Sequence, residues 1–179
     1  MAVNKESVLV VSDTHGCVKP LAAVFAWAAK RGLVRGLFLG DGADDIEPAA
    51  AASGTVFDWS AVRGNMDNAG PLSAVVELAG RKLYLAHGQG LGVEAGFETL
   101  AANALAAGAE AALFGHTHVP CFDVFNGVTF LNPGSVGRPR SRAGASFAVL
   151  EVPVRGPLNA VFWGITRAGS GYAIKQITL

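Results

Sequence analysis

The sequence is poor in charged residues, and neither sign of charge is in excess. Charged residues make up 16% of the 179 positions, and 14 Lys and Arg balance 14 Asp and Glu. Because a chain without net positive charge has little to hold a polyphosphate backbone, we do not expect a nucleic-acid polymer as a partner. The hydrophobic fraction of 51% is typical of a chain that folds and excludes a disordered one.

Long apolar runs and cysteines are also scarce. Residues 124–137 carry no ionisable side chain, but Asn, Pro and Gly interrupt them, and a membrane span needs about 18 to 20 apolar residues. Residues 8–11 are too few for the hydrophobic region of a signal peptide. Cys17 and Cys121 lie far apart, which favours two reduced thiols. We therefore expect a cytoplasmic protein that does not associate with membranes.

Apolar runs alternate with alanine-rich stretches, a pattern typical of an α/β protein. Ala79-Gly80 and Asn126-Gly127 are two-residue turn signals, and each predicts a hairpin. The second half of the chain is rich in expected strands, and we expect one domain over residues 1–179 with two sheets. The expected strands are 8–12, 37–39, 61–63 (or from Phe57), 72–78, 81–86, 111–114, 121–125, 128–131, 147–152, 161–166 and 172–177, and the expected helices are 20–30, 46–52 and 97–107.

Every histidine of the chain lies just past the end of an expected strand, and so do three oxygen-bearing side chains. Ligands of open α/β sheets bind at the carboxyl edge of the strands. If the strands are largely parallel, one crevice therefore receives all seven side chains. They are Asp13, His15, Asp41, Asn65, His87, His116 and His118.

Each of these residues also has a structural explanation when taken alone. Asp13 could cap the next helix, Asp41 could be a solvated loop acid, and Gly64-Asn65 could be a simple turn. His87 could be an ordinary loop or core histidine. Gly115-His116-Thr117-His118 is more specific, because two imidazoles one residue apart on a loop seldom have a purely structural use. Since structural accidents would scatter along the chain, the shared position of all seven favours a metal site.

Oxygen and nitrogen ligands without thiolates suit divalent ions such as Mn, Fe, Zn or Co. Seven ligands are too many for one ion. Two ions about 3.5 to 4 Å apart would use them all and would match the arrangement that promotes in-line displacement at phosphorus. We expect Asp41 to bridge the two ions, and we expect Mn²⁺ as the metal, with Fe, Zn, Ni or Co as alternatives.

The spaced motifs resemble those of the calcineurin-like metallophosphoesterases. They lie within residues 12–118, and the turn 132–135 adds a further likeness. The sequence is most similar to the small phosphodiesterases of the YfcE type, a group that includes relatives of the Vps29 scaffold. The motifs are Asp13-Thr14-His15, Gly40-Asp41-Gly42-Ala43-Asp44, Gly64-Asn65-Met66-Asp67, His87 and Gly115-His116-Thr117-His118.

The resemblance implies a four-layer αββα sandwich of two mixed sheets flanked by helices, with a dinuclear site. It places Asp13, His15, Asp41 and His118 on one ion. It places Asp41, Asn65, His87 and His116 on the other. The implied reaction is in-line attack of a metal-bound hydroxide on a small phosphodiester or phosphomonoester, with Asn65, Asp67 and His87 as catalytic residues.

Most of the superfamily has a histidine after the motif asparagine, where it protonates the leaving group, but here the residue is Met66. A thioether donates no proton, which typically costs 10²- to 10⁴-fold for a poor leaving group. The YfcE-type proteins also lack this histidine. Asp67 could position water or a ligand, or could be a turn acid. Arg138, Arg140 and Arg142 could clamp a phosphate, with Arg138 as the chosen substrate contact, or could form a solvated loop.

Two other classes of function compete with this prediction. Residues 90–95 match a glycine-rich dinucleotide fingerprint, but no acidic residue ends the following strand, as the fingerprint requires. A protein-binding scaffold of the Vps29 kind is the stronger rival, because Met66 weakens the catalytic case and the mean hydropathy of +0.37 leaves room for an apolar interface. Against it, a scaffold has no need of seven metal-binding side chains. The expected partner is a small phosphoester, and a homo-oligomer is compatible with the sequence.

Overall fold

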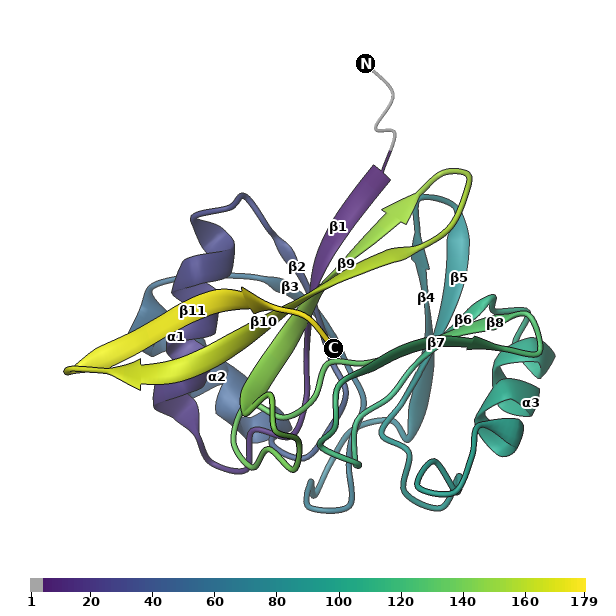
Figure 1. The fold of residues 1–179 in the computed structure, drawn as a ribbon, viewed down its shortest axis with the longest axis horizontal. Coiled ribbons are helices and arrows are strands. Elements are labelled where there is room, and N and C mark those ends of the chain that lie inside the picture. The colour runs from purple at the N-terminus through teal and green to yellow at the C-terminus, as the bar shows by residue number, and fades with distance from the viewer. Residues whose placement is uncertain (1–4) are drawn as a thin grey trace.

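Two β-sheets that face each other form the centre of the protein (Figure 1). The computed structural model describes residues 5–179. The first sheet has the strand order β11-β10-β9-β1-β2-β3, and the second has the order β4-β5-β6-β8-β7. The strands are β1 (Lys5–Val11), β2 (Arg35–Phe38), β3 (Asp58–Ala61), β4 (Ser73–Leu78), β5 (Arg81–Ala86), β6 (Ala111–Leu113), β7 (Cys121–Phe125), β8 (Val128–Asn132), β9 (Ala145–Pro153), β10 (Asn159–Ala168) and β11 (Gly171–Ile177).

Helices cover the outer faces of both sheets, which gives the predicted four layers (Figure 1). The helices α1 (Val18–Ala29) and α2 (Ile46–Ser53) pack against the first sheet, and α3 (Glu98–Ala106) packs against the second. A short 3₁₀ helix, η1 (Ala43–Asp45), precedes α2. No helix of residues 5–179 is long and apolar enough to span a bilayer.

The apolar run of β1 is explained by burial on both faces of its sheet. Val8 and Val10 belong to the apolar core between the two sheets, whereas Leu9 and Val11 belong to the core beneath α1 and α2. Successive side chains of a strand point to opposite faces, so a strand covered on both sides reads as a continuous apolar run. A third apolar core lies between the second sheet and α3.

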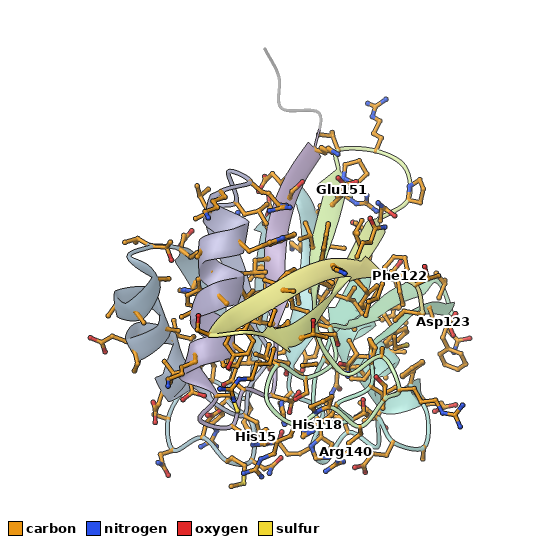
Figure 2. The ribbon with its side chains drawn as sticks, turned by 60° about the vertical axis from the view of Figure 1, so that its left-hand side comes forward. His15, His118, Phe122, Asp123, Arg140 and Glu151 are labelled. Atoms are coloured by element: carbon orange, nitrogen blue, oxygen red, sulfur yellow. The ribbon has the colours of Figure 1, made fainter. Side chains whose placement is uncertain are left out.

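The parallel strands place their carboxyl ends at the same end of the molecule. In the first sheet β1, β2 and β3 are parallel, and in the second β5, β6 and β8 are parallel. Figure 2 shows His15, His118 and Arg140 close together at the end of the molecule where these strands end. The sandwich therefore brings loops from both sheets into one place.

Both predicted hairpins are confirmed. Leu78 pairs with Arg81 across Ala79-Gly80, and Phe125 pairs with Val128 across Asn126-Gly127. All four turn residues have positive φ, between 50° and 77°, as a two-residue type I′ turn requires. Some boundaries differ from prediction: α1 begins at Val18 and not at Pro20, and β1 begins at Lys5 and not at Val8. Cys17 and Cys121 are free thiols, as expected.

Candidate metal centre

The predicted ligands occupy strained loop conformations at the strand ends. Among described residues other than glycine, seven have a positive φ, and five of these are predicted ligands. Such conformations cost of order 1 to 3 kcal/mol each and cluster at functional sites. The strained ligands are Asp13 (55°), His15 (46°), Asp41 (57°), His116 (65°) and His118 (60°).

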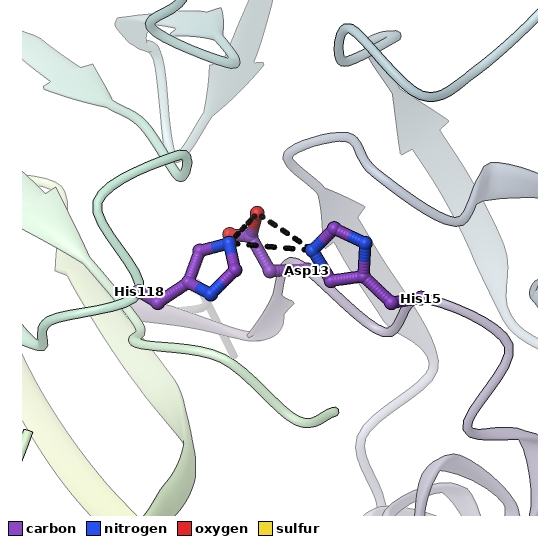
Figure 3. Close-up of side chains that lie close together, drawn as sticks. All are labelled: Asp13, His15 and His118. Carbon is purple, nitrogen blue, oxygen red and sulfur yellow. Dashed lines mark hydrogen bonds and ion pairs between the residues drawn. The ribbon is translucent and has the colours of Figure 1, made fainter. Parts of the chain in front are cut away.

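Asp13, His15 and His118 form a compact group (Figure 3). Oδ1 of Asp13 lies 3.1 Å from Nε2 of His118 and 3.8 Å from Nε2 of His15. The two imidazole Nε2 atoms are 3.3 Å apart. Asp13 is fully buried, and its other oxygen accepts the backbone N–H of His116 at 3.1 Å. One carboxylate oxygen and two ring nitrogens therefore face a common point.

Asp13, Asp41 and His87 form a second group, which shares Asp13 with the first. Nε2 of His87 lies 3.4 Å from Oδ2 of Asp41 and 3.8 Å from Oδ1 of Asp13. Oδ2 of Asp41 is also 3.8 Å from Nε2 of His15, so it faces a ring from each group. Its other oxygen accepts the backbone N–H of Met66 at 2.8 Å. Asp13 and Asp41 thus both lie between the two groups, and the choice of Asp41 as the bridge stays a prediction.

The donor chemistry of these groups fits divalent cations. Oδ1 of Asp13 and Nε2 of His87 are buried and have no hydrogen-bond partner among the described residues. A buried polar atom without a partner is costly, and a bound ion removes that cost. The Nδ1 atoms of His87 and His118 lie 2.6 Å and 2.5 Å from the carbonyl oxygens of Leu39 and Arg138. Since a carbonyl only accepts, these Nδ1 atoms carry the hydrogens and both Nε2 atoms present lone pairs to the site.

The pKa values of the two histidines in the first group, His15 and His118, are shifted in opposite directions. Burial lowers the pKa of His15; Asp13 and Asp41 oppose this shift, while His118 and Arg138 add to it. The Asp13 carboxylate, whose Oδ1 lies 3.1 Å from Nε2, raises the pKa of His118 against the effect of burial. His15 is therefore favoured as a neutral ligand, whereas at His118 a proton competes more strongly with a cation, so that metal binding weakens at low pH.

Two glycines are required by the close approach of the ligand loops. A Cβ on Gly64 would lie 2.0 Å from Oδ1 of Asp41, and a Cβ on Gly115 would lie 2.1 Å from Oγ of Ser12 and 2.8 Å from Oδ2 of Asp13. Real Cβ atoms do not approach other atoms so closely. The motif glycines therefore allow the backbone to pass directly against the two carboxylates.

A cavity of about 240 Å³ opens over these groups. Asn65 is exposed and lines it, and it makes no side-chain hydrogen bond within the described residues. His116 is half-buried in the wall, with its ring centroid 5.2 Å from that of His87. Met66 is 63% exposed and also lines the cavity. All seven predicted ligands thus lie at one site, the four most buried at its floor.

Asp67 holds two loops together. Its Oδ1 accepts the N–H groups of Gly42 (2.8 Å) and Ala43 (3.0 Å), and its Oδ2 accepts those of Asp41 and Gly64 (both 2.8 Å). Burial alone would raise the pKa of Asp67, but these four hydrogen bonds together lower it. Both oxygens of Asp67 accept hydrogen bonds from the backbone of the loops. Asp67 therefore positions Asp41 through the backbone of its loop.

The arginines predicted as a clamp divide into two groups. Arg138 and Arg140 are exposed and line the cavity, whereas Arg142 is not part of its lining. The backbone carbonyl of Arg138 is the acceptor for Nδ1 of His118. Arg138 therefore supports the site through its backbone as well as placing a guanidinium at its rim.

Several supporting residues escaped sequence reasoning. Asp45 accepts the hydroxyl of Thr14 and the N–H of Gly16. The buried Asn132 donates to the carbonyl of Gly115 at 2.7 Å and to the hydroxyl of Thr117 at 3.1 Å. Two features of the sequence could have indicated these residues: Asp45 follows another acidic residue, Asp44, and Asn132 begins the turn Asn132-Pro133-Gly134-Ser135. Neither feature indicates which groups the side chain contacts.

Comparison with known families identifies the class of protein. Residues 7–154 match the calcineurin-like phosphoesterase superfamily domain, and the chain belongs to this superfamily. Among curated proteins it is similar to the probable metallophosphoesterase YsnB of Bacillus subtilis. The two are 29% identical over 148 residues, which cover 82% of this chain and 84% of YsnB.

Solved structures share the fold. A conserved uncharacterized protein of Streptococcus pneumoniae, described as a predicted phosphoesterase, has a TM-score of 0.76 at 24% identity, covering 98% of this chain and all of that one. Vps29 of Cryptosporidium parvum has a TM-score of 0.74 at 18% identity, covering 99% of this chain and 100% of that one. The phosphoesterase YfcE of E. coli has a TM-score of 0.62 at 24% identity, covering 81% and 88%. The predicted four-layer fold and family are thereby confirmed.

Proposed function

We propose that this protein is a metal-dependent phosphoesterase that hydrolyses small phosphodiesters, with activity on monoesters as a lesser capacity. One observation carries the proposal: buried carboxylates and imidazoles from both sheets converge, and Oδ1 of Asp13 and Nε2 of His87 have no partner there among the described residues. Buried groups of this kind are paired or bind metals in proteins. The family membership supports the same chemistry.

The chain would hold two ions with its two groups of ligands. Asp13, His15 and His118 belong to one ion, and His87, with Asn65 and His116, belongs to the other. Asp41 faces both groups. When bound, two divalent ions supply positive charge for the phosphate oxygens and lower the pKa of water, and Mn²⁺ is our choice.

The remaining side chains bind and orient the ester. The guanidinium groups of Arg138 and Arg140 line the cavity and can pair with phosphate oxygens that the ions leave free. Met66 stands where a proton donor would serve the leaving group, and its thioether gives none. Esters whose alcohol leaves readily as an anion are therefore the favoured substrates.

A protein-binding scaffold is the second candidate function. Met66 favours it, as does the edge strand β7, on which Phe122 and Val124 are 36% and 63% exposed. The similarity in fold to Vps29 is consistent with it. The free thiols Cys17 and Cys121 support a reducing, cytoplasmic compartment for either function.

Turnover of bis-p-nitrophenyl phosphate and p-nitrophenyl phosphate with added Mn²⁺ tests the proposal. We expect hydrolysis of both, faster for the diester, with loss of turnover in Asp41→Asn and His116→Ala proteins that keep the wild-type circular dichroism spectrum. Asp123→Asn, at an exposed position on β7, is the matched control and should retain activity. A metal-loaded protein that hydrolyses neither ester would favour the scaffold.

A further inference from the structure

A second cavity, here called the side cavity, lies beside the metal centre and has a different character. Its volume is about 320 Å³. Apolar side chains form most of its wall: Val93, Phe97, Phe114 and Val119, together with the thiol of Cys121. The ring of Phe97 is held in place because it stacks on Phe130, with the centroids 4.6 Å apart. The side cavity is thus a fixed apolar recess large enough for an aromatic ring.

Three residues link the side cavity to the metal centre. Arg140 lines both cavities. Glu94, on the rim of the side cavity, has Oε1 3.1 Å from Nε2 of His116 in the wall of the metal centre. Thr117 lines the side cavity and stands between the ligands His116 and His118 in sequence. A molecule whose phosphate lies at the metal centre can therefore extend directly into the side cavity.

We propose that the side cavity binds the apolar or aromatic ester group of a phosphodiester substrate, the ester group that is not displaced. This inference rests on the proposed function. Arg140 stands between the two cavities, where its guanidinium can pair with the phosphate while the ring enters the apolar recess. A monoester leaves the recess empty, so the preferred substrate class is a diester with one bulky apolar alcohol. A side chain of a partner protein is the competing occupant.

Two diesters with the same leaving group test the proposal. Methyl p-nitrophenyl phosphate and phenyl p-nitrophenyl phosphate both release p-nitrophenolate and differ only in the retained group. We expect kcat/KM of the Mn²⁺-loaded protein to be about tenfold higher for the phenyl diester, because burying a ring removes apolar surface from water. This ratio should fall toward one in Val119→Asn, at the side cavity, and should persist in Val124→Asn, a matched change at an exposed position of β7.

Binding measured without turnover separates this proposal from the proposed function. By calorimetry, diphenyl phosphate should bind the Mn²⁺-loaded protein about tenfold more tightly than dimethyl phosphate, and Val119→Asn should remove the difference. If this binding preference holds while neither nitrophenyl diester is hydrolysed, the proposed phosphoesterase activity is wrong, but the assignment of the side cavity as a binding site is supported. Equal kcat/KM and equal affinity for the paired ligands in the wild type, or a preference that survives in Val119→Asn, would overturn the assignment of the side cavity.

The contact between His116 and Glu94 also carries a second inference, which concerns the metal centre itself. His87 and His118 direct Nδ1 at backbone carbonyls and Nε2 at the site. In His116 the outer partner is instead a carboxylate, and it contacts Nε2 at 3.1 Å. A neutral His116 that donates to this carboxylate would have the reverse arrangement, with the hydrogen on Nε2 and the lone pair on Nδ1.

We infer that Glu94 is a positioning residue that fixes His116 as an Nδ1 ligand of the metal centre. A carboxylate on the outer nitrogen holds a ligand ring in one tautomer and one orientation, and its loss typically weakens metal binding 10- to 100-fold. Glu94 lies on the loop 88–96, which contains the match to the glycine-rich dinucleotide fingerprint. The inferred role of this loop is to support the metal site, in place of binding a dinucleotide. This inference rests on the proposed metal centre.

Three variants test the role of Glu94. Glu94→Ala should weaken Mn²⁺ affinity at least tenfold by calorimetry, whereas Glu94→Gln, whose amide oxygen still accepts from Nε2–H, should restore most of it. Glu77→Ala, on the exposed face of β4, is the control and should match the wild type. In metal-free protein, ¹⁵N NMR should find hydrogen on Nε2 of His116 in the wild type and in Glu94→Gln, and a mixture of tautomers in Glu94→Ala. Unchanged affinity and an unchanged tautomer in Glu94→Ala would overturn the inference.

Discussion

Replacing Asp67 with asparagine should loosen the loops that carry Asp41 and Asn65. The Asp67 carboxylate accepts four backbone N–H groups at 2.8 to 3.0 Å, two on each oxygen. A hydrogen bond to a charged group contributes about 1.5 to 3 kcal/mol. Asparagine keeps one oxygen, but its NH₂ group would face two N–H donors that then lack an acceptor. Because the side chain is partly exposed and water can replace some of these bonds, we expect a loss of about 3 kcal/mol of unfolding free energy.

Urea unfolding measures this loss, and pH provides an independent check. The net lowering of the pKa of Asp67 means that the folded protein holds the ionised form more strongly than the unfolded chain does. This contribution to stability is therefore complete above the usual carboxyl pKa of 3.8 and is lost as pH falls through the lower folded value. In Asp67→Asn, the unfolding free energy should lack this part of its dependence on pH. Asp123→Asn, the exposed control, should stay within about 0.5 kcal/mol of the wild type.

The same variant separates a positioning role from a chemical one. If Asp67 only holds the loops, Asp67→Asn should weaken Mn²⁺ binding, and saturating Mn²⁺ should recover most of the turnover. An Asp67→Asn protein as stable as the wild type between pH 3 and 7, about the range in which carboxyl groups titrate, would refute the reasoning from its four hydrogen bonds.

Three further changes extend the account. Asn132→Ala removes the bonds to the loop that carries His116 and His118, so calorimetry should find Mn²⁺ affinity about 10- to 100-fold lower; unchanged affinity would contradict this role. Arg81→Met, at the opposite end of the sheets, removes contacts to Glu110 and to two carbonyls, and should cost about 2 to 3 kcal/mol of unfolding free energy without changing Mn²⁺ affinity. Since the Arg81 hydrogen bond lowers the pKa of Glu110, the wild type should lose this contribution as pH falls below about 4.5, and Arg81→Met should not. Met66→His should speed hydrolysis of alkyl phosphodiesters about 10²-fold or more and change p-nitrophenyl esters much less; equal effects on both would count against a missing acid.

The elements of the fold were largely predictable because local signals agree with the final packing. Asn126-Gly127 adopts the conformation that its residues favour, and the run 8–11 is apolar because both faces of β1 are buried. The division of strands between the sheets was not predictable from local pattern. Nothing in residues 128–131 indicates that β8 pairs in parallel with β6 as well as with its hairpin partner β7.

The ligands of the site were predictable for a similar reason: parallel strands deliver their ends to one edge, and every histidine follows such an end. The groups that hold the ligands in place were harder to find, because their contacts depend on how loops from distant positions meet. Asp67 bonds to Asp41, 26 positions away, and Glu94 meets His116 from another loop. One acidic residue in a loop has no spacing that would reveal such a partner.

The number of ions bound per chain tests the central claim most directly. Metal-free protein reloaded with Mn²⁺ and freed of excess should contain two equivalents by elemental analysis, and Asp41→Asn and His87→Gln should each hold one or fewer while remaining folded. A wild-type protein that retains no Mn²⁺, Zn²⁺ or Fe²⁺ above the level of those variants would contradict the account.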